Sequence, residues 1–179
     1  MKKNLLVASI ISAGIFSLSA SNALAADGQI NFIGTITDTT CTVVNTPENP
    51  LTVTLGTVSR TSLDGGAGKT AAPTAFKINL TNCPASLNGH TANVKFDGVS
   101  ANSDNSALKL TQDTGVATGV GIQITDNTGA VVPLYTPSSA YNLVTGDNSL
   151  DFVARYLSIA SAVTSGPANS TSQFTIVYN

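Results

Sequence analysis

The sequence predicts an all-β protein built as a sandwich of two antiparallel sheets. Short segments in which apolar and polar residues alternate recur along the chain, with turn signals between them. The composition is rich in Thr, Ser, Asn, Val and Gly and includes a single Glu, so runs of helix-favouring residues are missing. The 179 residues fit one domain with a substantial core, since no internal repeat or long linker divides the sequence.

The first 25 residues predict a secretion signal and not a part of the fold. Lys2 and Lys3 form a basic start, a mostly apolar stretch covers residues 5–18, and Ala23-Leu24-Ala25 is a small-x-small cleavage site. An uncleaved membrane anchor is the alternative, but the apolar stretch is shorter than the ~20 residues that a spanning helix needs. We therefore expect cleavage after Ala25 and an exported mature protein.

The first strand-like segment follows directly on this signal, at residues 28–37. Ile30, Phe32, Gly34 and Ile36 fall on one face of a strand, and the opposite face is mostly polar. A chain end with a one-sided apolar strand must bury that face. Its own sheet is one candidate partner, and a neighbouring molecule is the other.

Most of the remaining chain alternates in the same way. Residues 60–74 are rich in Gly and small side chains and predict a loop, and Asp126-Asn127-Thr128-Gly129 predicts a turn. Further strands are predicted over residues 51–58, 76–80, 92–96, 107–111, 119–124, 130–134, 150–157 and 172–178.

The two cysteines, Cys41 and Cys83, predict one disulfide. Both lie in the exported part of the chain, where an oxidising compartment favours pairing. The bond would close a loop of about 42 residues and stabilise the fold by roughly 4 kcal/mol. Metal binding is the alternative, but two cysteines and the single histidine, His90, make a poor metal site.

Catalytic and nucleotide-binding motifs are missing from the sequence. The run Asp64-Gly65-Gly66-Ala67-Gly68-Lys69-Thr70 superficially resembles a phosphate loop, but Leu63 occupies the position of the first glycine and no helix is predicted to follow. His90 is predicted to be a solvated residue at a loop tip, and no serine stands in a nucleophile elbow. We expect neither an enzyme nor a bound cofactor.

The charge of the chain argues against nucleic acid as a partner. It has eight Lys and Arg against ten Asp and Glu, and removal of the signal would leave a net charge of about −4. No basic patch is visible in the sequence.

The C-terminal end of the chain also carries a pattern that is informative about function. Phe174, Ile176 and Tyr178 alternate, and Gly166 stands fourteenth from the end. Further features are Gly34 ahead of Cys41, the Cys41–Cys83 spacing, and the strands at 119–124 and 152–156. In this combination and order the mature chain closely resembles the chaperone–usher pilins, the type 1-like fimbrial subunits.

The resemblance implies an incomplete immunoglobulin-like β-sandwich that lacks its last strand and leaves a hydrophobic groove open. Residues 26–38 would form an N-terminal donor-strand extension, and residues 39–179 the pilin domain. In a neighbouring subunit's groove, Phe32 would enter the first pocket, Gly34 a shallow pocket that admits only glycine, and Ile36 the next. Asp38 would occupy the following position.

The resemblance also implies partners for the end of the chain. The terminal strand with Phe174, Ile176 and Tyr178 would line the groove edge and pair with a periplasmic chaperone, whose basic residues would hold the Asn179 carboxylate. Gly166 belongs to the same C-terminal motif. An outer-membrane usher would then exchange the chaperone strand for the next subunit's extension.

The implied function is that of a structural subunit of an adhesive fimbrium on the bacterial surface, exported through the periplasm. A major shaft subunit is expected, because one small domain carries both a donor segment and an acceptor-type end. A minor adaptor or terminating subunit is the first alternative, and a single-domain adhesin that binds a host receptor is the second. The sequence names no receptor.

Overall fold

The computed structural model describes residues 28–36 and 39–179. The chain divides into one unit that ends at Ile36 and a second unit, Thr37–Asn179, and each is described by itself. The predicted signal, residues 1–25, lies outside the described residues. Within the described ranges, no helix is long and apolar enough to cross a membrane.

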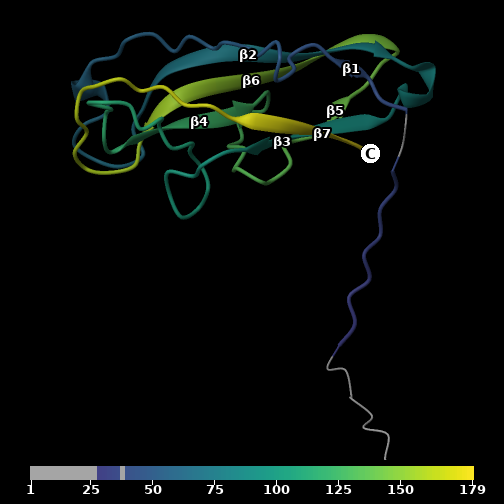
Figure 1. The fold of residues 1–179 in the computed structure, drawn as a ribbon, viewed down its shortest axis with the longest axis horizontal. Helices are drawn as coiled ribbons and strands as arrows, with labels where there is room; N and C mark the ends of the chain where they lie inside the picture. The colour runs from purple at the N-terminus through teal and green to yellow at the C-terminus, as the bar shows by residue number, and fades with distance from the viewer. Residues whose placement is uncertain (1–27, 37–38) are drawn as a thin grey trace, which may run out of the picture. The chain divides into compact units, whose positions relative to one another are not determined.

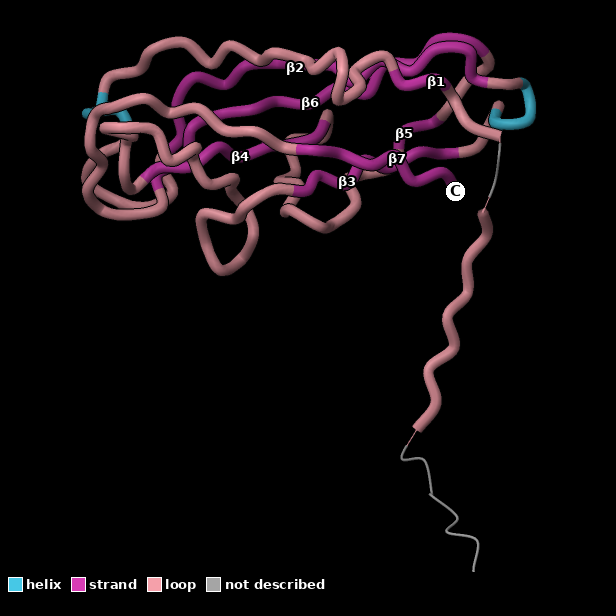
Figure 2. The backbone as a smooth tube through the Cα atoms, in the orientation of Figure 1, coloured by secondary structure: helices cyan, strands magenta, loops and turns pink. Residues whose placement is uncertain are grey.

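The second unit consists of two antiparallel sheets (Figure 1). One sheet has the order β1-β2-β6-β4, formed by Thr42–Val43, Thr70–Cys83, Gly146–Ser158 and Val120–Asp126. The other has the order β5-β3-β7, formed by Tyr141–Asn142, Thr91–Asp97 and Gln173–Tyr178. Two short 3-10 helices, η1 (Arg60–Ser62) and η2 (Ala85–Leu87), are the helical elements of the described chain (Figure 2). The predicted all-β sandwich is therefore confirmed.

Strands β2 and β6 form the longest pairing and carry the inner face of their sheet. Their register places Phe76 opposite Phe152, and next to this pair Lys77 lies 3.2 Å from the carboxylate of Asp151 on the solvent face. The register shifts between Ala71 and Thr74, where β2 contains Pro73. Because proline has no N–H to donate to the ladder, an irregularity at this point is expected.

Aromatic rings from both sheets meet in the main core. Phe152 on β6 is 1% exposed and packs edge-on against Phe96 on β3, with ring centroids 5.1 Å apart. Phe76 stacks on Phe152 at 5.6 Å, and Tyr141 lies at 5.5 Å from the same ring. Such contacts between the facing sheets hold the two layers together.

A second apolar cluster fills the end of the unit around Tyr156. Its buried members come from strands β4 and β6 and from the connecting loops: Leu63, Leu110, Ala117, Val120, Tyr156 and Val163. Burial raises the pKa of the Tyr156 phenol above its usual value. This cluster supports the loops at that end, where little regular structure is present.

Cys41 and Cys83 form the predicted disulfide, with their Cα atoms 4.2 Å apart. The bond joins the residue before β1 to the last residue of β2, and both cysteines are buried in the main core. It therefore fixes the short strand β1 to its neighbour.

A buried carboxylate organises the turn after β4. Asp126 is 2% exposed, and its Oδ1 accepts hydrogen bonds from the backbone N–H groups of Thr128 (2.9 Å) and Ala130 (3.1 Å) and from the Thr128 hydroxyl (2.6 Å). Its Oδ2 accepts from the backbone N–H and the hydroxyl of Ser139. Burial opposes ionisation, but the hydrogen bonds from Ser139 and Thr128 outweigh it, so the pKa of Asp126 is lowered. The predicted turn at 126–129 is confirmed.

Several predicted strand limits were wrong. Residues 107–111 and 130–134 form isolated bridges through Leu108 and Val131 and not strands. The predicted loop at 60–74 ends early, because β2 already begins at Thr70. The short strands β1 and β5 were not predicted, since two residues carry no detectable alternation.

Candidate functional site

The segment 28–36 is extended and exposed along its whole described length. The side chains of Ile30, Phe32 and Ile36 are 77%, 92% and 102% exposed, and Ile33 on the other face is 97% exposed. Within the described residues the segment belongs to no strand pair. Apolar side chains of this size are normally buried, so the segment presents a surface that requires a partner.

Gly34 is not required by anything within the described chain. A Cβ built on it meets no atom within 4 Å, and its backbone does not lie in the left-handed region. A glycine at this position is therefore explained by neither local packing nor local backbone geometry. A glycine at this position would be explained by a contact with another molecule that leaves no room for a side chain.

Strand β7 is an edge strand whose inner face is incompletely covered. In the described chain it pairs only with β3, so its second backbone edge is free. Its inward residues Phe174, Ile176 and Tyr178 are only half-buried, whereas Val94 and Phe96 on the neighbouring β3 are 0% and 3% exposed. Burial nevertheless raises the pKa of the Tyr178 phenol.

The segment 51–58 presents a second unpaired edge. It was predicted to be a strand, and Val53, Leu55 and Val58 do turn inward and are half-buried. Among the described residues, however, no strand pairs with it, so it is extended chain and not part of a sheet. The prediction was right about the alternation and wrong about the pairing, because a strand also needs a hydrogen-bonded neighbour.

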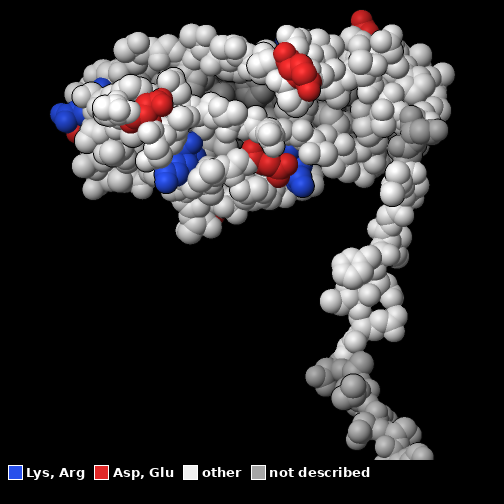
Figure 3. Space-filling view, in the orientation of Figure 1, with Lys and Arg blue, Asp and Glu red and all other residues white. Residues whose placement is uncertain are grey.

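These two edges run in opposite directions. At one end, the Tyr178 phenol interacts with the backbone of Cys41, the residue before β1. At the other end, Leu55 and Val58 share the second cluster with Ala168. The chain therefore passes along β7 antiparallel to it, and Figure 3 shows a hollow in this face beside β7. We call this space the edge groove, bounded by residues 51–58 and 168–178.

The floor of the edge groove is apolar. Phe76 is only half-buried although its ring contacts Phe152 and Phe96, so part of the main core is accessible from outside. The groove therefore combines an unpaired strand edge with exposed apolar core. Addition of a strand from another chain can cover both.

The edge groove ends in a cavity of about 330 Å³. Its apolar floor is built by residues of the second cluster, with the Tyr156 hydroxyl 3.4 Å from the carbonyl oxygen of Gly56. The lining residues are Gly56, Thr57, Val58, Arg60, Leu63, Ala117, Val120, Tyr156, Val163, Thr164, Ser165, Gly166, Pro167, Ala168 and Asn169.

Gly166, which the sequence singled out, lies in the wall of this cavity. A Cβ on Gly166 would lie 2.0 Å from the carbonyl oxygen of Gly115 and 2.7 Å from the backbone nitrogen of Ala117. The chain is held at this distance by a hydrogen bond from the Ala117 N–H to the Pro167 carbonyl oxygen (2.9 Å). Glycine is needed here because two backbones approach too closely for any side chain.

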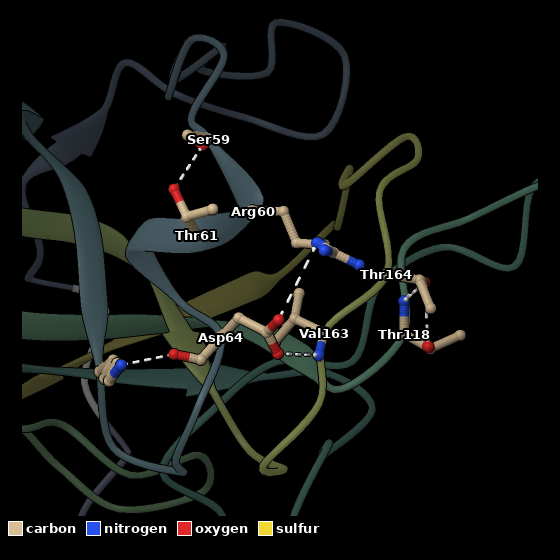
Figure 4. A network of polar contacts seen from close by, with 8 residues as sticks. Ser59, Arg60, Thr61, Asp64, Thr118, Val163 and Thr164 are labelled. Atoms are coloured by element: carbon tan, nitrogen blue, oxygen red, sulfur yellow. Dashed lines mark hydrogen bonds and ion pairs between the residues drawn. The ribbon is translucent and has the colours of Figure 1, made fainter.

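A polar network borders the same cavity (Figure 4). One carboxylate oxygen of Asp64 accepts a hydrogen bond from the backbone N–H of Val163 (3.1 Å), and the other lies 4.0 Å from the Arg60 Nε. On the far side, the Thr164 hydroxyl accepts from the Thr118 N–H at 2.8 Å. Arg60 could not be selected from the sequence, because its position at the cavity depends on how the chain folds.

The C-terminal residue extends the pairing of β7 with β3. The Asn179 N–H donates to the Thr91 carbonyl oxygen (2.8 Å), and the Thr91 N–H donates to the Asn179 oxygen (3.0 Å). His90, predicted to be a solvated loop residue, is exposed, and its Nδ1 lies 3.2 Å from the same oxygen. The chain end is thus held at the opposite end of the edge groove from the cavity.

Comparison with known proteins gives a consistent result. The family model described as "Fimbrial protein" matches residues 30–179. The "Type-1 fimbrial protein subunit" of Serratia marcescens is 39% identical over 99% of both chains. "Long polar fimbria protein A" of Salmonella typhimurium is 33% identical over 99% of this chain and 97% of its own length. These relatives are structural subunits and not enzymes.

Solved structures show the same fold. A type I fimbria protein of Burkholderia pseudomallei is 38% identical, with a TM-score of 0.59 over 84% of this chain and 97% of its own. The P pilus rod subunit PapA is 23% identical, with a TM-score of 0.64 over 78% of this chain and 99% of its own. The second likeness concerns the fold alone.

Proposed function

The chain belongs to the Fimbrial protein family, and we propose that it polymerises by donor-strand exchange as the major shaft subunit of its fibre. It is a fimbrial subunit of chaperone–usher pili. In the proposed mechanism, residues 26–38 of one subunit act as the donor extension. They occupy the edge groove of the pilin domain, residues 39–179, of its neighbour.

The observation that carries the proposal is a match between two features of one chain. The edge groove offers two free backbone edges above an apolar floor. The segment 28–36 offers an unpaired extended backbone with Ile30, Phe32 and Ile36 exposed on one face. Each feature supplies what the other is missing: hydrogen-bonding groups for the open edges and apolar side chains for the floor.

Physical chemistry also favours one orientation of the donor. The two edges of the groove run in opposite directions, so a strand between them is antiparallel to one edge and parallel to the other. We propose that the donor runs antiparallel to β7, because β7 is the edge that already belongs to a sheet and antiparallel pairing is slightly more stable per residue. Its C-terminal end then reaches the cavity near Ala168. In this orientation Ile36, the last apolar residue of the donor face, is the side chain that fills the cavity.

The energies are sufficient for a stable fibre. Burial of Ile30, Phe32 and Ile36 contributes roughly 1.5–3 kcal/mol each. Each main-chain hydrogen bond along the new strand adds about 0.5–1.5 kcal/mol. Because donor and groove lie on different parts of the same subunit, the contact is head-to-tail and does not close, so it propagates into a filament.

The same groove needs protection before assembly. We propose that a periplasmic chaperone covers it with a strand of its own, with β7 as the pairing edge and the Asn179 carboxylate held by chaperone basic residues. The usher at the outer membrane would then direct replacement of that strand by the next subunit's donor. In this scheme Gly166 shapes the wall of the cavity that the donor enters.

Deletion of residues 28–36 tests the mechanism. We expect the shortened subunit to fold and to bind its chaperone, because neither the sheets nor β7 includes this segment. Fibres should be missing, as seen by electron microscopy of cells that express the variant. Fibres of normal length after this deletion would refute donor-strand exchange.

The shaft role is tested by removing the whole protein from cells. Loss of the entire fibre supports a shaft subunit, because each subunit would occupy repeated positions along it. A fibre with a bare or altered tip would instead identify a minor adaptor or an adhesin. For the adhesin alternative, the donor-complemented protein should bind a glycan array.

A further inference from the structure

We propose that Gln123 and Arg155 form a carboxylate-binding site on the outer face of the β1-β2-β6-β4 sheet, which holds an acidic side chain of a second copy of this chain in the fibre. The inference rests on the proposed polymerisation, which brings copies together. It goes beyond that function, because the site lies outside the edge groove. It also gives a role to two strand motifs, residues 119–124 and 152–156, that the donor mechanism leaves unexplained.

The two side chains lie beside each other on neighbouring strands. Gln123 on β4 is directly opposite Arg155 on β6 in the antiparallel register. Ile124 and Ala154, the next residues of the same strands, are buried in the core, so alternation turns Gln123 and Arg155 to the other face of the sheet. The edge groove opens onto the core side of this sheet. The site therefore stays accessible when a donor strand fills the groove.

Hydrogen bonds hold the guanidinium in a fixed orientation. The Nε and Nη2 groups of Arg155 both donate to the Oε1 atom of Gln123, at 3.0 Å and 2.7 Å. Gln123 is 6% exposed, so its own side chain is confined by its surroundings. These bonds use the Nε side of the guanidinium fork. Among the described residues the Nη1 group has no hydrogen-bond partner, and the edge that it forms with Nη2 can bind both oxygens of a carboxylate.

Gln123 orients Arg155 without neutralising its charge. In the described part of the chain no carboxylate lies within 4.0 Å of this guanidinium, whereas Arg60, Lys77 and Lys95 each have one, at 4.0, 3.2 and 3.9 Å. Arg155 is also half-buried. A charge that is partly removed from water is stabilised by a counter-ion, so this cation has a reason to bind one.

A second copy of the chain offers suitable partners. Acidic side chains that are exposed and have no Lys or Arg within 4.0 Å among the described residues are Glu48, Asp104, Asp113 and Asp147. The whole chain has ten acidic against eight basic side chains, so its surfaces are complementary to an unpaired cation. A fibre holds copies at high effective concentration, which allows a single weak ion pair to form between them.

A purely structural role for the pair is the alternative. The pair would then only fasten β4 to β6, and a carboxylate at position 123 would do so at least as well, because a charge-assisted bond is stronger than a neutral one. In the proposed site the same carboxylate would occupy the guanidinium and exclude the acidic group of another copy. Gln123→Glu therefore separates the two roles.

The test is chemical cross-linking in fibres assembled from the full mature chain. Arg155→Lys keeps the positive charge and introduces an amine, which a carbodiimide joins to a carboxylate in contact with it. Mixed isotope-labelled and unlabelled subunits let mass spectrometry distinguish a link between copies from a link within one copy. We expect a link from position 155 to one of the four exposed carboxylates of another copy. High salt during the reaction should lower its yield, because salt screens the pair.

Two further variants and an internal control sharpen the result. Adding Gln123→Glu to Arg155→Lys should replace the link between copies by a link within one copy. Lys109 is the matched control, because it is exposed and has no carboxylate within 4.0 Å in the described chain. Its cross-links should not respond to Gln123→Glu. If Arg155→Lys does not fold, Val153→Lys supplies an amine from the next outward position of β6 and leaves the pair intact.

Two outcomes would overturn the site. One is that neither Arg155→Lys nor Val153→Lys gives a link between copies in fibres that form normally. The other is that the link persists unchanged after Gln123→Glu. In either case, fibres that still depend on residues 28–36 would leave donor-strand exchange standing while this inference falls. Fibres that form without residues 28–36 would refute the exchange instead.

Discussion

Replacement of Gly34 by valine separates the folding of the subunit from its assembly. In the subunit itself, a Cβ at Gly34 meets nothing within 4 Å and no left-handed backbone is needed. The free energy of unfolding should therefore change by less than about 0.5 kcal/mol, as for other surface substitutions.

Assembly should respond very differently. If Gly34 enters a shallow part of the neighbour's groove, the added methyl groups must displace atoms of a packed floor. Overpacking of this kind costs about 1–3 kcal/mol. Since about 1.4 kcal/mol corresponds to a factor of ten, the stability of the subunit contact should fall roughly five- to hundred-fold.

Thr35→Val is the appropriate control for Gly34→Val. It introduces the same β-branched side chain one position later, on the opposite face of the strand. Fibre formation by purified subunits and denaturant unfolding of the monomer are measured for both variants. Equal assembly by the two variants, or a destabilised Gly34→Val monomer, would refute the assignment of Gly34 to a restricted pocket.

Three further predictions concern the stability of the domain. Gly166→Ala should lower the free energy of unfolding by at least about 1–3 kcal/mol, because its Cβ would lie 2.0 Å from a carbonyl oxygen; an unaltered denaturation midpoint would contradict this. Replacement of Cys41 and Cys83 by serine should cost roughly 2–5 kcal/mol in thermal or denaturant unfolding. Asp126→Asn should weaken the pH dependence of stability. Because the pKa of Asp126 is lowered in the fold, its contribution is present above its ordinary pKa and is lost as the pH falls below about 4. Unfolding curves of wild type and variant should therefore converge in acid, and parallel curves would contradict the assignment.

The longer strands of the sandwich could be predicted from their alternation, in the middle of a sheet as well as at its edge. Residues 92–96 and 150–157 alternate clearly and lie inside β3 and β6, because each strand packs one face on the core and pairs on both sides. Strands β1 and β5 escaped prediction because two residues are too few to show a period. Bridges such as the one through Leu108 escaped because their pairing depends on loop geometry.

The candidate site was predictable only in part, for a related reason. The exposed donor face could be predicted, because apolar alternation is a local property of the sequence. The same is true of the terminal strand with Phe174, Ile176 and Tyr178. The cavity and Arg60 could not be predicted, because their lining comes from segments far apart along the chain. Only the folded chain brings η1, Tyr156 and Gly166 together.

The segment 51–58 links the fold to the function. Its sequence alternates as clearly as that of β3, yet among the described residues it has no partner, and the facing edge of β7 has none either. Two strand-like edges that flank a half-exposed Phe76 leave the subunit with both unpaired backbone and exposed core. A sequence that maintains such edges on both sides of one groove is best explained by a strand that arrives from another molecule. The segment 28–36, with its single apolar face, is the part of this chain that meets that requirement.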